Sequence, residues 1–166
     1  MKTRIEGIGE VVIQEIPQDR VIECAKFLIS VYKHEGIWTW YTLTHAIAEF
    51  SASFSGNLLR PHYMMATLDG KVIGTVGWQE SFMSCHGYEL SFAAVDPTYQ
   101  KKGLGTLLLT LAIKDVLKHH KDPVFLTETR QPLLFERFGF QRLHSYEEFG
   151  EHVFMICPFN DLKLPL

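Results

Sequence analysis

The sequence predicts an α/β fold with a mixed, mostly antiparallel central sheet of six to seven strands and helices on both faces. The first observation is the order of the elements, because extended apolar runs alternate with amphipathic helical segments. The second is Asp69-Gly70 between two extended runs, a dipeptide that supplies the positive φ angles of a two-residue hairpin turn. The third is the apolar segment 103–119, which has leucines at helical spacing.

Composition limits the class of protein. The chain has 166 residues, 46% hydrophobic and 21% charged, so we expect one soluble globular domain over residues 1–166 and exclude intrinsic disorder. No apolar run reaches the roughly 18 residues of a membrane span. A net charge of −3 excludes sequence-independent binding to nucleic acid. Cys24, Cys85 and Cys157 lack paired spacing and the start shows no secretory signal, which predicts a cytoplasmic protein without a metal site.

The N-terminal third predicts one strand and two helices. Residues 10–16 are rich in Val and Ile and form the expected strand, which ends at Pro17. Asp19 is the expected N-cap of the first helix. The apolar stripe of that helix comprises Val21, Ile22, Ala25, Leu28, Ile29 and Tyr32. A second helix is expected within residues 39–53.

The middle of the chain predicts three strands. Residues 64–68 and 71–78 form the hairpin around Asp69-Gly70. The next strand, 88–95, stops at Asp96-Pro97. Strict alternation assigns Leu90, Phe92 and Ala94 to one face of it, and Glu89, Ser91, Ala93 and Val95 to the other.

After the helix 103–119, the chain predicts a strand at 123–127 and a helix at 132–138, with Pro132 at its start and Gly139 just past its end. Two strands, 140–144 and 152–157, close the sequence. The aromatic residues Phe149, Phe154 and Phe159 of this closing part could be covered by a second copy of the chain, which would give a homodimer.

The segment 95–106 carries the clearest chemical signal. A buried strand ends in a polar turn, and Gly103 and Gly105 open an amphipathic helix. Amides at this position lack intrahelical partners and the positive end of the helix dipole faces outward, so the site favours a phosphate-bearing ligand. A Walker loop needs Lys-Ser/Thr where Thr106-Leu107 stands, and a dinucleotide fingerprint needs a glycine or alanine at Leu108, so both are excluded.

What remains is Gln-x-x-Gly-x-Gly at Gln100, Gly103 and Gly105, which resembles the pyrophosphate-binding motif of the GCN5-related N-acetyltransferase (GNAT) family. The preceding Ala-Ala-Val-Asp-Pro and the Phe-Glu-Arg-Phe-Gly-Phe box at 135–140 resemble the same family, and the resemblance covers most of residues 64–140. It implies the GNAT fold, acetyl-CoA as co-substrate and no metal.

The resemblance also implies a binding mode. The pantetheine arm would pair with the strand ending at Val95 like an added strand. An amide near Ala93 or Ala94 would face the thioester carbonyl and stabilise its developing oxyanion. The residues so implied in binding are Ala93, Ala94, Val95, Gln100, Lys101, Lys102, Gly103, Leu104, Gly105 and Thr106. For the two lysines, a solvated basic pair is the alternative interpretation.

Glu89 is the candidate catalytic base. It lies fourteen residues before Gly103, the spacing at which histone-type members of the family place a glutamate base. A solvated strand-end carboxylate is the alternative, and Glu80 and Glu128 are the fallback bases. An acyl-enzyme is not expected, because no Cys or Ser lies in a nucleophile arrangement.

Two departures from the family pattern concern the leaving group. Phe135 stands where many members have a tyrosine that protonates the departing thiolate, and Glu128 stands where an asparagine is frequent. Tyr99, Tyr146 and Thr129 are substitute proton donors. The thiol has an ordinary pKa near 8.5, so it can leave without an acid.

The sequence therefore predicts direct acetyl transfer from acetyl-CoA to a primary amine of a small molecule or peptide, in a ternary complex. The alternative is an acyl-CoA-binding sensor or regulatory module of the same fold. The aromatic stretch 34–41 lies where relatives form acceptor-side walls, and a loop packed onto the core is its other interpretation.

Overall fold

The computed structural model describes residues 1–36, 42–56, 60–81, 86–146 and 152–165. The strands are β1 (Lys2–Ile5), β2 (Gly9–Glu15), β3 (His62–Leu68), β4 (Lys71–Glu80), β5 (Gly87–Val95), β6 (Val124–Thr129), β7 (Gln141–Tyr146) and β8 (His152–Pro158). The α-helices are α1 (Val21–His34), α2 (Leu43–Ala52), α3 (Leu104–His119) and α4 (Pro132–Glu136).

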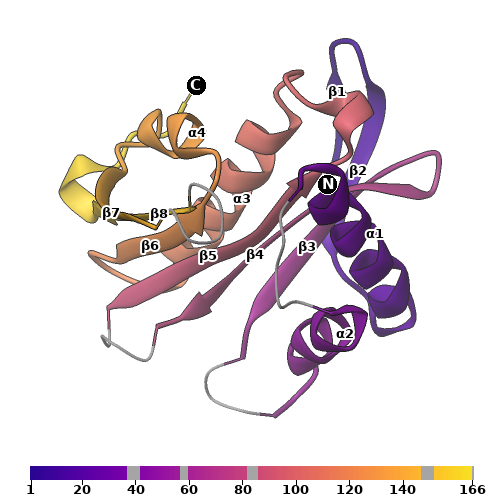
Figure 1. Cartoon of the computed structure of the whole chain (residues 1–166), viewed down its shortest axis with the longest axis horizontal. Coiled ribbons are helices and arrows are strands. Elements are labelled where there is room, and N and C mark those ends of the chain that lie inside the picture. Colours follow the sequence, from indigo (N-terminus) through magenta and orange to yellow (C-terminus); the bar gives the residue numbers. More distant parts are fainter. Residues whose placement is uncertain (37–41, 57–59, 82–85, 147–151, 166) are drawn as a thin grey trace.

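The strands form one sheet in the order β1-β2-β3-β4-β5-β6-β8-β7. Among the described strands β5 and β6 pair in parallel, and all other neighbours are antiparallel. Helices α1 and α2 cover one face of the sheet and α3 covers the other (Figure 1). The predicted fold class is confirmed.

The hairpin at Asp69-Gly70 has the geometry that the dipeptide predicts. Asp69 has φ +49° and Gly70 has φ +80°, so both central residues adopt the left-handed conformation that matches the twist of the flanking strands. The strand β1 was not predicted. It is a short edge strand without a buried residue, so its polar sequence shows no apolar alternation.

Helix α1 begins one residue later than its predicted cap implies. Asp19 lies in a short 3₁₀ turn, Gln18–Arg20, and the N-cap residue is Arg20, whose side chain makes no capping hydrogen bond. Ile22, expected in the apolar stripe, is 55% exposed. The buried face consists of Val21, Cys24, Ala25, Leu28 and Val31.

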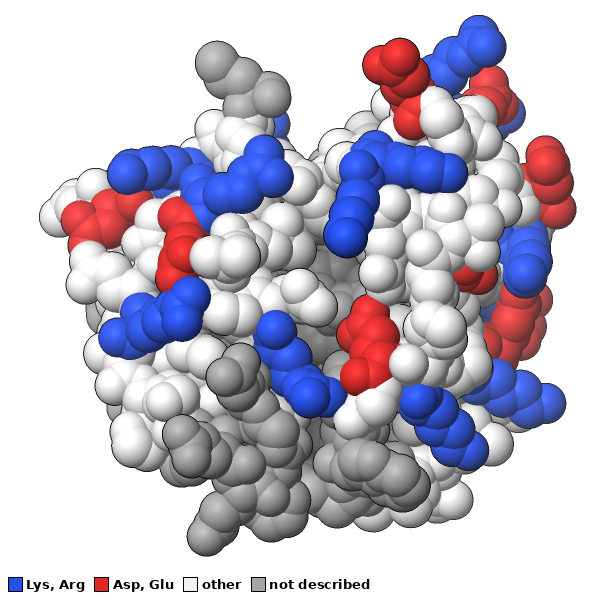
Figure 2. Space-filling view, turned by 45° about the horizontal axis from the view of Figure 1, so that its top comes forward, with Lys and Arg blue, Asp and Glu red and all other residues white. Residues whose placement is uncertain are grey.

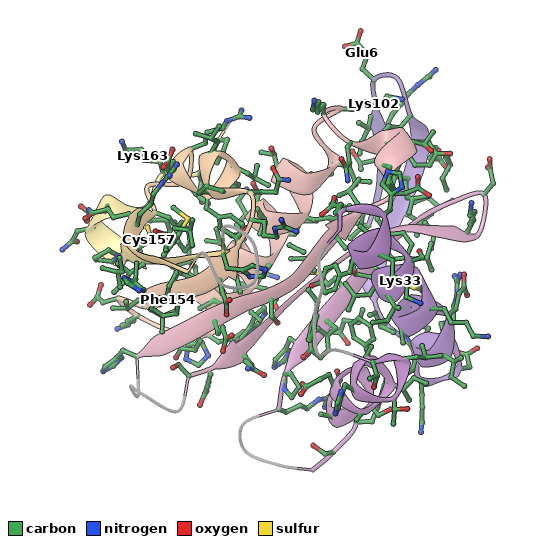
Figure 3. All side chains as sticks on the ribbon, in the orientation of Figure 1. Glu6, Lys33, Lys102, Phe154, Cys157 and Lys163 are labelled. Carbon is green, nitrogen blue, oxygen red and sulfur yellow. The ribbon has the colours of Figure 1, made fainter. Side chains whose placement is uncertain are left out.

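Helix α2 begins at Leu43, after Thr42, whose hydroxyl accepts a hydrogen bond from the His45 amide. Residues 39–41 of the predicted helix lie outside the described residues, as does most of the aromatic stretch 34–41. Of the aromatic residues assigned to a homodimer surface, Phe149 also lies outside them, Phe154 is half-buried on β8 (Figure 3) and Phe159 is exposed.

Membrane-spanning helices and clusters of metal-binding side chains are both absent from the parts of the chain that the structure describes. No helix there has both the length and the apolar character needed to cross a bilayer. No three or more His, Cys, Asp or Glu side chains there are gathered in a metal-binding arrangement.

Two buried thiols give a pH-dependent contribution to stability. Burial raises the pKa of Cys24 to about 12, from an ordinary 9.0, and that of Cys157 to about 11. The folded thiols therefore stay protonated to higher pH than the unfolded ones, so this stability is fully present below about pH 9 and is lost as the pH rises above it.

We expect wild type to lose unfolding free energy between pH 9 and 11 more steeply than the Cys24→Ala variant. The difference in slope is at most about 1.4 kcal/mol per pH unit, the linkage of one proton. Urea denaturation at a series of pH values measures it. Parallel curves for the two proteins would show that Cys24 does not titrate differently on unfolding.

Candidate active site

A bulge in β5 forms one wall of the site. Thr75 of β4 pairs with Ala94 and Gly77 pairs with Ser91, so Phe92 and Ala93 together oppose Val76. Phe92 has φ +51°, which breaks the alternation of the strand. The predicted common face of Leu90, Phe92 and Ala94 is therefore wrong. Leu90 packs in the core under α3, whereas Phe92 and Ala94 pack in the core under α1 and α2.

Strand β5 separates from β6 after Glu89, before the chain reaches the bulge. The two strands pair only over three positions, from Gly87 with Val124 to Glu89 with Leu126. Two buried threonine hydroxyls then bind carbonyl groups of β5: Thr127 Oγ1 donates to Leu90 O at 3.1 Å and Thr75 Oγ1 donates to Phe92 O at 2.9 Å. On its β6 side the end of β5 thus borders a gap, while on the other side Ala94 and Val95 still pair with β4.

A cleft of about 770 Å³ lies at this gap. Its walls come from the end of β5, the start of α3, helix α4, the end of α1 and the C-terminal segment. The lining includes the basic residues Lys101 and Arg137 and the acidic residue Glu35. Figure 2 shows basic side chains on several sides of the central hollow and an acidic side chain beside it. A ligand with negative charge fits these surroundings.

The start of α3 presents free amide groups to the cleft. Gly103 is the N-cap residue with φ +87°, and the first intrahelical bond runs from the Leu107 amide to the Gly103 carbonyl at 3.0 Å. The amides of Leu104, Gly105 and Thr106 therefore precede the helical ladder and have no intrahelical acceptor. The helix dipole adds positive potential at the same point, so the turn can hold a phosphate group.

Most residues predicted to bind the co-substrate line this cleft. They are Ala93, Ala94, Val95, Gln100, Lys101, Gly103, Gly105 and Thr106. Leu104 does not, because its side chain is fully buried in the core and only its amide belongs to the helix start. The Lys102 side chain lies beside Gly7 in the β1–β2 turn, with Nζ 5.6 Å from the centre of the Tyr99 ring (Figure 3).

The three candidate bases lie in different places. Glu89 is half-buried and pairs across the sheet with Gln79, whose Nε2 donates to Glu89 Oε2 at 3.2 Å. It lies on the face covered by α1 and α2, because its neighbour Leu90 faces α3. Glu80 pairs with Tyr88, which packs under α3, and so lies on the opposite face. Glu128 is exposed and bonds to His152 Nδ1 at 3.0 Å.

The position of the missing tyrosine and the three candidate proton donors lie on different elements of the fold. Phe135 is buried against Phe140, with ring centres 5.4 Å apart, and offers no hydroxyl. Thr129 Oγ1 accepts a hydrogen bond from the Gln131 amide at 3.0 Å. The Tyr99 ring lies under Lys102, and Tyr146 ends β7 opposite His152.

Further residues, which the sequence did not indicate, complete the cleft from distant parts of the chain. These are Glu35, Thr75, Leu108, Leu109, Gln131, Leu133, Leu134, Arg137 and Pro165. Glu35 lies in the aromatic stretch 34–41 and Arg137 in the box at 135–140, but nothing local to either residue indicates that it faces this cleft. The fold brings the end of α1, helix α4 and the C-terminal segment to the same opening.

The Thr75 hydroxyl gives a test of the bulge. Thr75→Val keeps the shape of this fully buried side chain but removes the donor to the Phe92 carbonyl, so we expect a loss of about 1–3 kcal/mol of unfolding free energy. Thermal unfolding should show a melting temperature lower by roughly 2–10 °C. Thr44→Val, at an exposed position on α2, is the matched control and should change little. Equal melting temperatures for all three proteins would contradict this role.

The bulged strand, the gap beside it and the helix start define a class of α/β protein with a break in its sheet, where free amide groups can receive a phosphate-bearing ligand. The comparisons with known proteins name the family. Residues 60–142, half of the chain, match the family model described as an acetyltransferase (GNAT) domain. The chain therefore belongs to the GNAT acetyltransferase family, as the resemblance predicted.

Solved structures share the fold at low sequence identity. yncA from Salmonella typhimurium, solved with its cofactor acetyl-CoA, is 20% identical, with a TM-score of 0.68 over 94% of this chain and 98% of that one. The GNAT domain of S. lividans PAT is 14% identical, with a TM-score of 0.73 over 96% of each chain. A GNAT acetyltransferase from Staphylococcus aureus is 18% identical, with a TM-score of 0.70 over 89% of this chain and 98% of that one. No curated protein sequence matches the chain.

Proposed function

We propose that this protein transfers the acetyl group of acetyl-CoA to a primary amine by direct attack in a ternary complex. The observation that carries the proposal is the break between β5 and β6 beside the free amides of α3. This arrangement offers one strand edge to an extended arm and a helix start to a diphosphate at the same opening. Membership of the GNAT family supports the same reaction.

The cleft fits acetyl-CoA by size and by chemistry. Its volume of about 770 Å³ lies within the range of ligand pockets in general. Gly105 lines the cleft, and a Cβ added there would make only ordinary contacts, 3.7 Å from Val95 Cγ2 and 3.9 Å from Leu134 Cδ2, so a larger side chain at this position would narrow the cleft. The amides of Leu104, Gly105 and Thr106 would hold the diphosphate, and Ala93 to Val95 would pair with the pantetheine arm.

The proposed reaction uses one protein carboxylate. The neutral amine attacks the thioester carbonyl carbon, a C–N bond forms, the C–S bond breaks, and coenzyme A leaves as a thiolate. Glu89 accepts the proton that the amine loses, directly or through water. An amide at Ala93 or Ala94 stabilises the oxyanion of the tetrahedral intermediate.

A second candidate function follows from Phe135. Phe135 is buried and has no hydroxyl, so it cannot protonate the leaving thiolate. A protein of the same fold that binds acyl-CoA without turnover would have no need of such a group.

Two measurements on wild type separate these functions. Acetyl-CoA at about a hundred times its dissociation constant should stabilise the fold by about 2.7 kcal/mol, which raises the melting temperature by roughly 5–10 °C. Thiol release in the presence of a panel of primary amines should then reveal the acetyltransferase. A melting shift without thiol release for any amine favours the sensor, and no melting shift at all contradicts both functions.

A further inference from the structure

The end of α1 is hydrogen-bonded to two side chains that lie far away in the sequence. Gln100 Nε2 donates to Glu35 Oε1 at 2.6 Å. Arg130, which follows β6, donates from a guanidinium nitrogen to Gly36 O at 3.0 Å and to Glu35 O at 3.4 Å. These contacts join residues 65, 94 and 95 positions apart in the sequence. We call Glu35, Gly36, Gln100 and Arg130 the α1 clasp.

Gln100 has no donor left for a phosphate group. A glutamine amide carries two N–H groups, and the second of these is directed to Val95 O at 3.0 Å. Both partners are acceptors, so rotation of the amide would place its oxygen against two other oxygens, and the orientation is fixed. The remaining carbonyl oxygen can only accept, and a diphosphate offers it no proton at neutral pH.

The clasp lies between the cleft and the face of the sheet that carries Glu89. Glu35 and Gln100 line the cleft, whereas α1 packs on the Glu89 face of the sheet. The end of α1 therefore lies between the cleft proposed for acetyl-CoA and the face of the sheet that carries the proposed base. The last carbonyl groups of a helix carry partial negative charge, so the guanidinium of Arg130 is favourably placed at this end of α1.

We propose that Gln100 and Arg130 are positioning residues that hold the end of α1 for the amine substrate, and that the side chain of Gln100 is not a ligand of the diphosphate. The inference rests on the proposed function for its kinetic part. The diphosphate is then held by backbone amides and not by the first residue of the Gln-x-x-Gly-x-Gly motif. Removal of either positioning side chain should disturb the amine site and leave acetyl-CoA binding intact.

The variants are Gln100→Met and Arg130→Met, which keep apolar bulk and remove every donor. Gln14→Met, at an exposed position on β2 far along the chain, is the matched control. Calorimetry should give dissociation constants for acetyl-CoA within about twofold of wild type for all three variants. Initial rates should show the KM for the amine raised about tenfold in Gln100→Met and Arg130→Met, but unchanged in Gln14→Met.

Hydrogen exchange tests the clasp without turnover. The Glu35 amide bonds to Val31 O in the last turn of α1, and we expect its exchange to be about tenfold faster in Gln100→Met and Arg130→Met than in wild type or the control. A tenfold loss of acetyl-CoA affinity in Gln100→Met would overturn the proposal, as would unchanged exchange at this turn. If wild type binds acetyl-CoA but acetylates no amine, the proposed function fails while these two measurements still decide the role of the clasp.

Discussion

Gly105→Glu is expected to abolish acetyl-CoA binding while the protein stays folded. Gly105 does not need a positive φ, and a Cβ there would make only ordinary contacts with Val95 and Leu134, so the backbone tolerates a side chain. The added carboxylate would lie among the amides of the first turn, where it occupies the phosphate position and repels a diphosphate. The expected loss is several kcal/mol, or roughly a hundredfold or more in the dissociation constant.

Calorimetry and the acetyl-CoA melting shift measure this effect, and the chain offers a close control. Gly56 also has an ordinary φ, and nothing lies within 4 Å of a Cβ added to it. Gly56→Glu thus makes the same chemical change at an exposed position and should bind acetyl-CoA like wild type. Gly105→Ala should fold and give an intermediate affinity. Binding by Gly105→Glu as tight as by wild type would place the diphosphate away from the start of α3.

The parts of the fold that sequence could predict are those whose signals are local. The Asp69-Gly70 turn depends on two adjacent residues that tolerate positive φ. The start of α3 depends on Gly103 and on the apolar face that follows it within one segment. In both cases the interactions that fix the conformation lie within a few residues, so the printed sequence contains them.

The parts that sequence could not predict depend on contacts between distant segments. The bulge at Phe92 reverses the facing of β5, and its carbonyl is held by Thr75 from the neighbouring strand. Both N–H groups of the Gln100 side chain donate to protein acceptors, one of them to Glu35 at the end of α1. The motif itself does not indicate this contact with α1. The motif thus predicts a ligand-binding turn at the start of α3, whereas the structure shows protein partners for the motif's first side chain.

Glu89→Gln is expected to lower kcat by about 10²–10⁴-fold and to leave the acetyl-CoA dissociation constant unchanged. Glutamine keeps the shape of the side chain, and its carbonyl oxygen can still accept the hydrogen bond from Gln79 Nε2. It cannot take up the proton that the attacking amine must lose. The loss should therefore appear in turnover, measured by thiol release at saturating substrates, and not in stability or in binding.

The choice of amine and of control makes this test specific for proton transfer. An amine of low pKa should lose less activity in Glu89→Gln than an alkylamine, because its nitrogen is more acidic in the tetrahedral intermediate and gives up the proton more readily without a base. Glu80→Gln is the control. Glu80 follows Gln79 on β4 and lies on the opposite face of the sheet from Glu89, so this variant should retain activity. If Glu89→Gln and wild type turn over every amine equally fast, Glu89 is a sheet carboxylate bonded to Gln79, and the proton leaves by another route.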